Sequence, residues 1–274
     1  MKTFAEFRLT TALLKKIYIG DIVVSSTSHD LTATLKKHPK LVIALNHGPM
    51  AGALSGLISI TDLFLQSGGA TRYPFGITWR TFYKLPVTKQ ILSYVTQVNK
   101  GLGFEDANSL LSDSDFTDCF IMPEGELCSF GNGLDIQPFL SPRFIELAIR
   151  NNTPILIAAQ QGSEKWAWPI NVNKSLKPLL NWLPKNMKEG FKHSGIISIP
   201  KPFRRKLSRL YMSFYLYQPK LKLSDLAEDK DKRLKQLTVE SDIVRQHMQK
   251  MVNQLEQERN EHKYQAQTEL DFQR

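Results

Sequence analysis

The chain has 274 residues, of which 42% are hydrophobic and 23% are charged, an ordinary composition for a globular protein that can bury a sizeable core. Its two cysteines, Cys119 and Cys128, exclude a disulfide framework and fit a reducing compartment. No apolar run reaches the roughly 18–20 residues of a membrane span. Glu6 and Arg8 interrupt the start of the chain, so no secretory signal is expected.

The net charge of +10 is concentrated in parts of the chain. Residues 165–222 contain thirteen Lys or Arg and one acid, Glu189, and the first forty residues contain seven bases and three acids. Basic patches attract phosphate-bearing surfaces, either nucleic acid or anionic lipid. No nucleic-acid recognition motif accompanies the basic stretch. We therefore expect a cytoplasmic protein whose partner is an anionic membrane surface rather than nucleic acid, bound peripherally to the inner face of a membrane.

Residues 1–20 are predicted to form a basic amphipathic helix, because five apolar side chains recur at helical spacing between Lys and Arg residues. These side chains are Phe4, Phe7, Leu13, Leu14 and Ile17. Such a helix either lies in a membrane interface or packs on the protein core. The pattern leaves both possibilities open.

Two short apolar runs, Leu41–Leu45 and Cys119–Met122, are predicted to be buried strands. Pro49 follows the first run and precedes the apolar stretch Ala51–Leu65, which predicts a helix starting near Pro49. Pro123 stops the second run. The first run is therefore expected to lead through a tight turn into a helix.

Residues 143–150 show helical periodicity, and Pro154–Ala159 is predicted to be a third buried strand. Ile196–Ile199 and Leu210–Tyr217 are two further strand candidates. Strands that alternate with helices predict an α/β fold with a largely parallel central sheet flanked by helices.

Seven residues between 234 and 255 follow the 3-4 spacing of a heptad pattern, which predicts one long helix with an apolar seam packed on the domain. The seam consists of Leu234, Leu237, Ser241, Val244, Met248, Met251 and Leu255. Residues 257–274 have little apolar content and are expected to fray. We divide the chain into an amphipathic N-terminal segment (1–35), a main domain (36–222), and a charged C-terminal helix with its tail (223–274).

His47 is the first candidate for chemistry, because it follows a buried strand and precedes a helix. A neutral imidazole can take a proton from an attacking hydroxyl, and such general-base help is worth roughly 10²–10⁴ in rate. The positive end of a helix disfavours imidazolium and would keep the base free. Asn46 could orient the loop through hydrogen bonds. Taken alone, a histidine at this place is more often structural.

Glu124 lies in the segment Met122–Glu126, which also follows a predicted strand. The carboxyl ends of parallel strands share one crevice, so His47 and Glu124 are expected to lie at the same cleft. Glu124 could accept a hydrogen bond from an acceptor hydroxyl, and Gly125 allows close approach of the backbone. Backbone N–H groups near Gly48 or Gly125 could stabilise an oxyanion. The alternative for this segment is an ordinary turn.

Four segments in order resemble the blocks of the lysophospholipid acyltransferase superfamily, which includes the 1-acylglycerol-3-phosphate acyltransferases. They are Asn46–Gly52 (NHGPMAG), Gln97–Gly101 (QVNKG), Met122–Phe130 (MPEGELCSF) and Thr153–Ile157 (TPILI). The resemblance covers about residues 40–220 and makes residues 36–222 an acyltransferase domain.

The resemblance implies transfer of a fatty acyl group from acyl-CoA or acyl-carrier protein to a hydroxyl of a glycerolipid or lysophospholipid, as in phospholipid biosynthesis. It assigns His47 as the general base with Asn46 beside it. It assigns acceptor binding to Pro123, Glu124, Gly125 and Lys100.

The sequence departs from the family pattern at two places. Gly52 stands where the family has an Asp that orients the histidine, and Leu127 or Cys128 stands near the place of an Arg that holds the acceptor's phosphate. Lys100 keeps one charge, although a lysine lacks the bidentate fork of an arginine. A neutral lipid alcohol, or a phospholipid held by the basic stretch, is therefore the expected acceptor.

No metal-binding Cys/His spacing, Walker loop or Rossmann glycine pattern is present in the sequence, so neither a metal nor a bound cofactor is expected. The alternative to an enzyme is a catalytically degenerate relative that binds lipid at the membrane surface. The two departures at Gly52 and Leu127 motivate this alternative.

Overall fold

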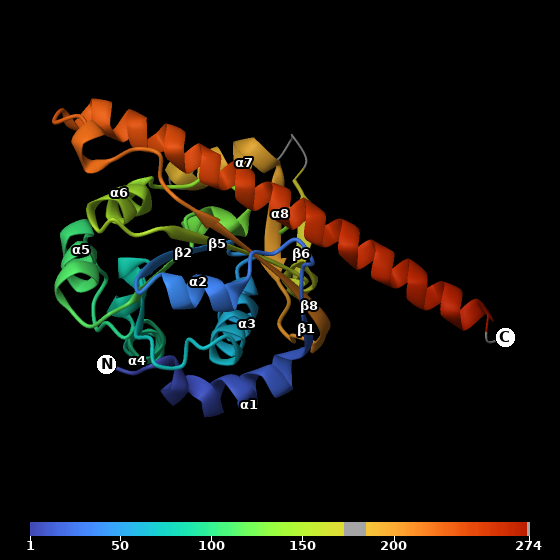
Figure 1. Ribbon diagram of the computed structural model, residues 1–274. Helices are drawn as coiled ribbons and strands as arrows, with labels where there is room; N and C mark the ends of the chain where they lie inside the picture. The colour runs from blue at the N-terminus through green and yellow to red at the C-terminus, as the bar shows by residue number, and fades with distance from the viewer. Residues whose placement is uncertain (173–184, 273–274) are drawn as a thin grey trace.

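A computed structural model describes residues 1–172 and 185–272, and a six-stranded sheet lies at its centre (Figure 1). In spatial order the strands are β1 (Ile19–Val24), β8 (Leu207–Tyr217), β5 (Ile155–Gln161), β2 (Leu41–Leu45), β4 (Asp118–Ile121) and β3 (Pro74–Gly76). All neighbouring strands pair in parallel except β5 and β8. The prediction of an α/β fold with a largely parallel sheet is confirmed.

Helices cover both faces of this sheet. One face packs against η1 (Phe4–Phe7), α1 (Arg8–Tyr18), α2 (Leu31–Lys37) and α3 (Gly52–Gln66). The other face packs against α5 (Phe104–Asp113), α6 (Arg143–Arg150) and α8 (Lys230–Phe272). Each face has its own buried apolar cluster, as expected for strands that are apolar on both sides.

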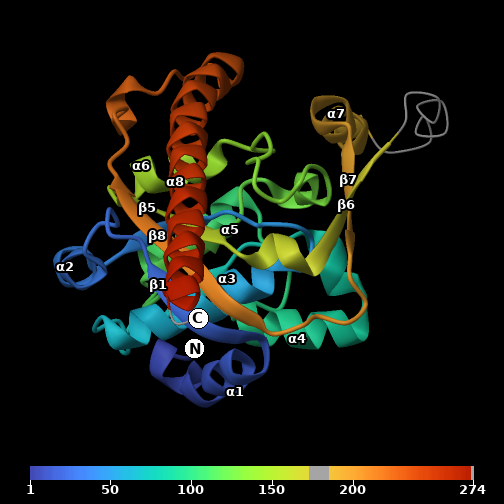
Figure 2. The same ribbon diagram turned by 90° about the vertical axis from the view of Figure 1, so that its right-hand side faces the viewer.

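The remaining elements lie around these layers. α4 (Pro86–Thr96) adjoins β3, and η2 (Arg80–Lys84) contacts α4. η3 (Gly125–Ser129) follows β4, and η4 (Ser163–Trp166) follows β5. A two-stranded antiparallel sheet, β6 (Ala167–Asn171) and β7 (Ile196–Pro200), projects to one side with α7 (Lys185–Ser194), as Figure 2 shows. η6 (Leu223–Asp225) precedes α8. The part of the basic stretch from 173 to 184 lies outside the described residues.

The expected helix over residues 1–20 is too long at both ends, since the helical residues run from Phe4 to Tyr18. α1 ends at Tyr18, and Ile19 begins a strand that pairs with β8. The β-branched residues that follow, in the sequence IGDIVV, favour this strand. The segment 1–35 is therefore not wholly helical, since its strand belongs to the central sheet.

Two other boundaries differ from the expectations. α3 begins at Gly52 rather than near Pro49, whose carbonyl instead accepts a turn hydrogen bond from the Gly52 N–H. The expected fraying after residue 257 is wrong, because α8 continues to Phe272. Contacts of Glu258 with Ser25 and of Arg259 with Glu164 hold the helix beyond residue 257.

The apolar seam of α8 is largely confirmed. Leu237, Val244 and Met248 are almost completely buried against the sheet, and the other seam residues up to Leu255 are buried as well. Leu234 is the exception, with 45% of its surface exposed. None of the helices in the described part of the chain combines the length and apolar composition needed to cross a membrane.

Candidate active site

His47 lies directly after β2, in the loop that leads to α3. Its main-chain N–H donates to Glu124 Oε1 at 2.8 Å, and its carbonyl accepts a hydrogen bond from Gln160 Nε2 at 3.3 Å. β2 pairs in parallel with both β4 and β5, so the loops after these three strands meet at one edge of the sheet. His47 and Glu124 therefore adjoin, but the expected shared cleft is not found, because Glu124 is not among the described residues that line the cavity at His47.

Asn46 is 1% exposed and locks the end of β2 to β5. Its Nδ2 donates to the Gln160 carbonyl at 3.1 Å, and its Oδ1 accepts from the Gln160 N–H at 2.7 Å. Both polar atoms of the side chain are therefore occupied by the main chain of the neighbouring strand. Asn46 fixes the position of the loop, as expected, and does not face the cavity described below.

The imidazole of His47 is partly buried and lines a cavity of about 410 Å³. Burial lowers the pKa of His47 from 6.5 to about 4. Interactions with the backbone at Gly48 and His47 raise the pKa, but their effect is smaller than that of burial. The ring is therefore neutral at pH 7. Its Nδ1 is buried and has no hydrogen-bond partner among the residues that the structure describes.

The cavity at His47, which we call the apolar cavity, is bounded by η1, α1, α3, β3, α4 and the end of β4. Its wall includes Phe4, Leu54, Ile58, Phe75 and Phe120. None of its described lining residues is an Asp, Glu, Lys or Arg. The cavity therefore suits an apolar chain, with one neutral imidazole in its wall.

Glu124 is 3% exposed, and both of its carboxylate oxygens are occupied. Oε1 accepts from the His47 N–H and Oε2 accepts from the Gln137 N–H, each at 2.8 Å. Burial raises the pKa of Glu124 to about 7, and these two hydrogen bonds oppose the rise. Glu124 thus ties the His47 loop to residues 131–142, and its predicted hydrogen bond to an acceptor hydroxyl stays a prediction.

Pro123 and Gly125 shape the turn around Glu124 rather than the apolar cavity. The Pro123 carbonyl accepts from the Leu140 N–H at 3.0 Å. Gly125 has a φ of 54°, a backbone conformation that residues with a side chain rarely adopt. A Cβ at this position would also lie only 2.6 Å from Leu140 Cδ1. Both the backbone conformation and the lack of space therefore favour glycine. The Gly125 N–H donates to the Met122 carbonyl and is not available for an oxyanion.

Lys100 lies away from the apolar cavity. It forms an exposed ion pair with Asp106 at 3.0 Å and lines a different cavity, which shares no lining residue with the one at His47. Cys128 is buried, and burial raises the pKa of its thiol to about 12. A thiol with this pKa is a poor nucleophile at neutral pH.

Gln160 is a site residue that the sequence reasoning missed. Its side chain donates to the carbonyls of His47 and Gly52, and its Oε1 accepts from Ser55 Oγ at 2.8 Å. It thereby joins the His47 loop to the first turn of α3. A polar residue at the carboxyl end of an apolar strand beside β2 was the signal that could have identified it.

The fold and this geometry define an α/β protein with a neutral histidine at the carboxyl edge of a mostly parallel sheet, facing an apolar cavity. Comparison with known proteins adds no family to this description: no protein-family model, no curated protein and no solved structure matches the chain.

Proposed function

We propose that this protein is an O-acyltransferase that transfers a fatty acyl group from acyl-CoA or acyl-carrier protein to a hydroxyl of a glycerolipid or lysophospholipid. The observation that carries the proposal is the neutral imidazole of His47 in the wall of an apolar cavity of about 410 Å³. The four sequence segments that resemble lysophospholipid acyltransferases support the same chemistry.

In the proposed reaction, His47 accepts the proton of the acceptor hydroxyl while the oxygen attacks the thioester carbonyl carbon. The C–S bond then breaks, and the imidazolium returns the proton to the departing thiolate. Burial makes the imidazolium costly, since the pKa of His47 is about 4. Return of the proton to a thiolate, whose conjugate acid has a pKa of about 8.5, is therefore strongly favourable.

The apolar cavity supports an acyl chain as the bound group. Each buried methylene of a chain contributes roughly 0.8 kcal/mol to binding through the hydrophobic effect. No Lys or Arg is among the described residues that line this cavity, and Lys100 faces elsewhere. This favours an acceptor whose reacting end is neutral over a simple glycerol phosphate.

Exposed apolar side chains around the cavity support a membrane surface as the partner. Four residues both line the cavity and are exposed, namely Met50, Phe82, Tyr94 and Val95. On α1, Leu9, Leu13 and Ile17 are exposed as well, and Figures 1 and 2 both show α1 and α4 at the same end of the molecule. A lipid could enter the cavity from a bilayer at this end.

The proposal is tested by the His47→Ala variant in an assay of labelled acyl transfer with lysophospholipid, monoacylglycerol and diacylglycerol acceptors. Loss of the base should lower turnover by about 10²–10⁴. His262→Ala, on the far part of α8, is the control and should retain turnover. Undiminished turnover by His47→Ala would exclude His47 as the base.

The second candidate function is lipid binding without catalysis. Two observations favour it: His47 Nδ1 has no partner within the described residues, and the adjacent carboxylate of Glu124 is fully used by main-chain N–H groups. In other histidine-centred sites, loss of the acid that orients the histidine lowers kcat by up to about 10⁴. Wild-type protein that binds lipid vesicles but acylates no acceptor in the panel would establish this alternative.

A further inference from the structure

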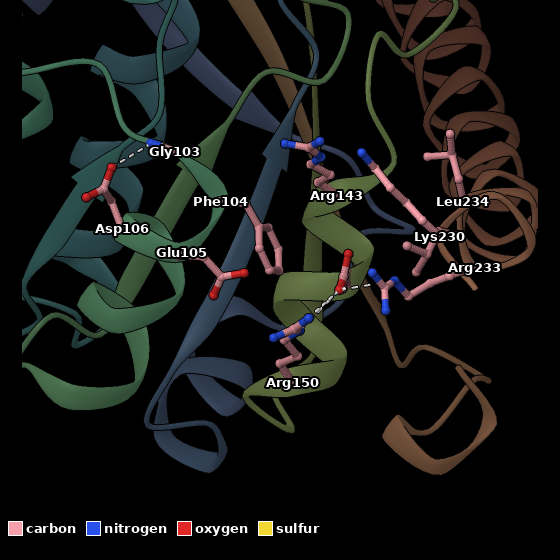
Figure 3. A pocket seen from close by; sticks show the side chains of 11 residues that line it. Gly103, Phe104, Glu105, Asp106, Arg143, Arg150, Lys230, Arg233 and Leu234 are labelled. Carbon is pink, nitrogen blue, oxygen red and sulfur yellow. Dashed lines mark hydrogen bonds and ion pairs between the residues drawn. The ribbon is translucent and has the colours of Figure 1, made fainter. Parts of the chain in front are cut away.

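A third cavity, of about 470 Å³, lies on the opposite face of the sheet from the apolar cavity, between α5, α6 and the first turns of α8 (Figure 3). We call it the α6–α8 pocket. Four cations line it, namely Arg143, Arg150, Lys230 and Arg233. It shares no lining residue with the apolar cavity at His47.

Two of the four cations are already paired. Arg150 donates to Glu146 Oε1 from Nε at 3.1 Å and from Nη2 at 2.8 Å, and Arg233 Nε lies 3.7 Å from the same oxygen. Glu146 is only 7% exposed, so this arrangement is held in a partly desolvated place. Glu146, Arg150 and Arg233 are therefore held in place by one another in the wall of the pocket.

The other two cations, Arg143 and Lys230, are unpaired. Their side chains make no hydrogen bond or ion pair with the part of the chain that the structure describes. Figure 3 shows the amino group of Lys230 directed toward the guanidinium of Arg143 across one rim of the pocket. Two like charges that converge repel each other unless an anion lies between them. Lys230 also begins α8, where the helix dipole favours negative charge.

The interior of the pocket also offers a flat apolar surface. The ring of Phe104 is covered on one side by Arg150, whose guanidinium carbon lies 5.1 Å from the ring centroid. Leu234, which is 45% exposed, continues this surface on α8. On the α5 side, Glu105 is an exposed acid that makes no ion pair within the described residues and could accept from an amino group of a ligand.

We propose that the α6–α8 pocket binds a nucleoside phosphate, with phosphoryl oxygens between Arg143 and Lys230 and the base over Phe104. Arginine binds phosphate oxygens through two parallel N–H groups, and lysine adds a point charge. The volume of about 470 Å³ lies within the usual range for small-molecule sites. This site is separate from His47 and does not depend on the proposed acyl transfer.

The test is calorimetric titration of the full chain with AMP, ADP, ribose 5-phosphate and inorganic phosphate. Saturable binding of one nucleotide per chain, tighter than binding of inorganic phosphate, is expected. Arg143→Gln and Lys230→Gln should each weaken nucleotide binding about tenfold or more, because each removes a charge-assisted hydrogen bond. Phe104→Leu should weaken AMP and ADP but leave inorganic phosphate unchanged.

Lys235→Gln is the charge-matched control, since Lys235 is exposed on α8 and does not line the pocket. Equal weakening by Lys235→Gln would show diffuse attraction to a basic surface and would overturn the proposal. The absence of saturable nucleotide binding, or binding that no pocket variant changes, would overturn it as well. Arg143 and Lys230 are exposed, so thermal unfolding of the variants should match that of the wild type.

Discussion

Gly52 occupies the place where the family resemblance expects an orienting Asp, and its surroundings exclude a side chain. A Cβ at this position would lie 2.8 Å from the His47 carbonyl oxygen and 2.8 Å from Ser163 Oγ. The close approach lets Gln160 reach the carbonyls of both His47 and Gly52. The site thus lacks a carboxylate at position 52, and the side-chain amide of Gln160 holds the His47 loop instead.

Gly52→Asp is therefore expected to destabilise the protein and not to increase acyl transfer. Overpacking of this kind costs about 1–3 kcal/mol, measurable as a lower urea midpoint. The double variant Gly52→Asp with Ser163→Gly should regain part of this loss, because it removes one of the two crowded neighbours. A stable Gly52→Asp protein with raised turnover would contradict this expectation and would show that an Asp fits at position 52 and can orient His47.

The lowered pKa of His47 predicts how stability changes with pH. The pKa is about 4 in the folded state and 6.5 ordinarily, so the unfolded chain binds more protons in this interval. The contribution of His47 to stability is present above pH 6.5 and falls by about 3 kcal/mol as the pH drops to 4.

The measurement compares urea unfolding of the wild type and His47→Gln between pH 7 and pH 4. The comparison with a variant is needed because Glu124, whose pKa is raised to about 7, changes stability in the opposite sense over part of this range. The wild type should lose stability relative to His47→Gln as the pH falls. If the difference in unfolding free energy between the wild type and His47→Gln stays constant from pH 7 to pH 4, the lowered pKa of His47 is contradicted.

At the scale of elements, α8 braces both loops that hold His47. Gln249 Oε1 accepts from the Ile136 N–H at 2.7 Å, next to Gln137, whose own N–H donates to Glu124. On the other side, Arg259 pairs with Glu164 at 2.6 Å, in the η4 turn that follows β5. In the described residues, α8 contacts the segments that position the site, and the charge of Arg245 on α8 also acts to lower the pKa of Glu124.

Gln249→Ala is expected to loosen residues 134–137 and to lower acyl transfer while leaving the apolar cavity in place. Loss of the acceptor for a partly buried N–H costs about 1–3 kcal/mol locally. Hydrogen–deuterium exchange of the 131–142 segment should increase, and the rate of transfer should fall. Gln246→Ala, an exposed glutamine on the same helix, is the control. Unchanged exchange in Gln249→Ala would contradict the bracing role.

The sequence predicted the elements with strong local patterns, and it missed those that depend on distant partners. Leu41–Leu45 and residues 143–150 are found as predicted, because their apolar patterns are continuous. β1 was missed because its strand character depends on pairing with β8, almost two hundred residues later. At the site, the proximity of His47 and Glu124 was predictable, because the carboxyl ends of parallel strands lie at the same edge of a sheet. The individual hydrogen bonds of Gln160 and Gln249 could not be predicted, since the sequence pattern indicates at most where a side chain lies and not which polar atoms it meets.

At the scale of the whole molecule, exposed apolar side chains gather on α1, η2 and α4. On α4, Val87 is 71% exposed and Ile91 is 60% exposed, and on α1 Leu9 is 85% exposed. Met50 and Phe82, which line the apolar cavity, are exposed as well. Large apolar patches of this kind mark interaction surfaces.

The double variant Val87→Asp with Ile91→Asp is expected to reduce binding to vesicles of phosphatidylserine and phosphatidylcholine. The two changes remove apolar contacts worth up to about 1.5–3 kcal/mol each and add charges that repel an anionic surface. Co-sedimentation measures the effect, and folding stability should change by less than about 1 kcal/mol in total. Val239→Asp, an equally exposed valine on α8, is the control. Undiminished binding by the double variant would exclude this end as the docking surface.

The position of α8 in the chain also affects when the site can assemble during translation. His47 and Glu124 emerge from the ribosome well before residues 245–259, which brace their loops, and β1 has no neighbour until residues 207–217 are made. Since synthesis proceeds at about 5–20 residues per second, the nascent chain carries an unbraced histidine loop for several seconds. Chains terminated before residue 245 would contain His47 but not the contacts from α8 that hold the neighbouring segments.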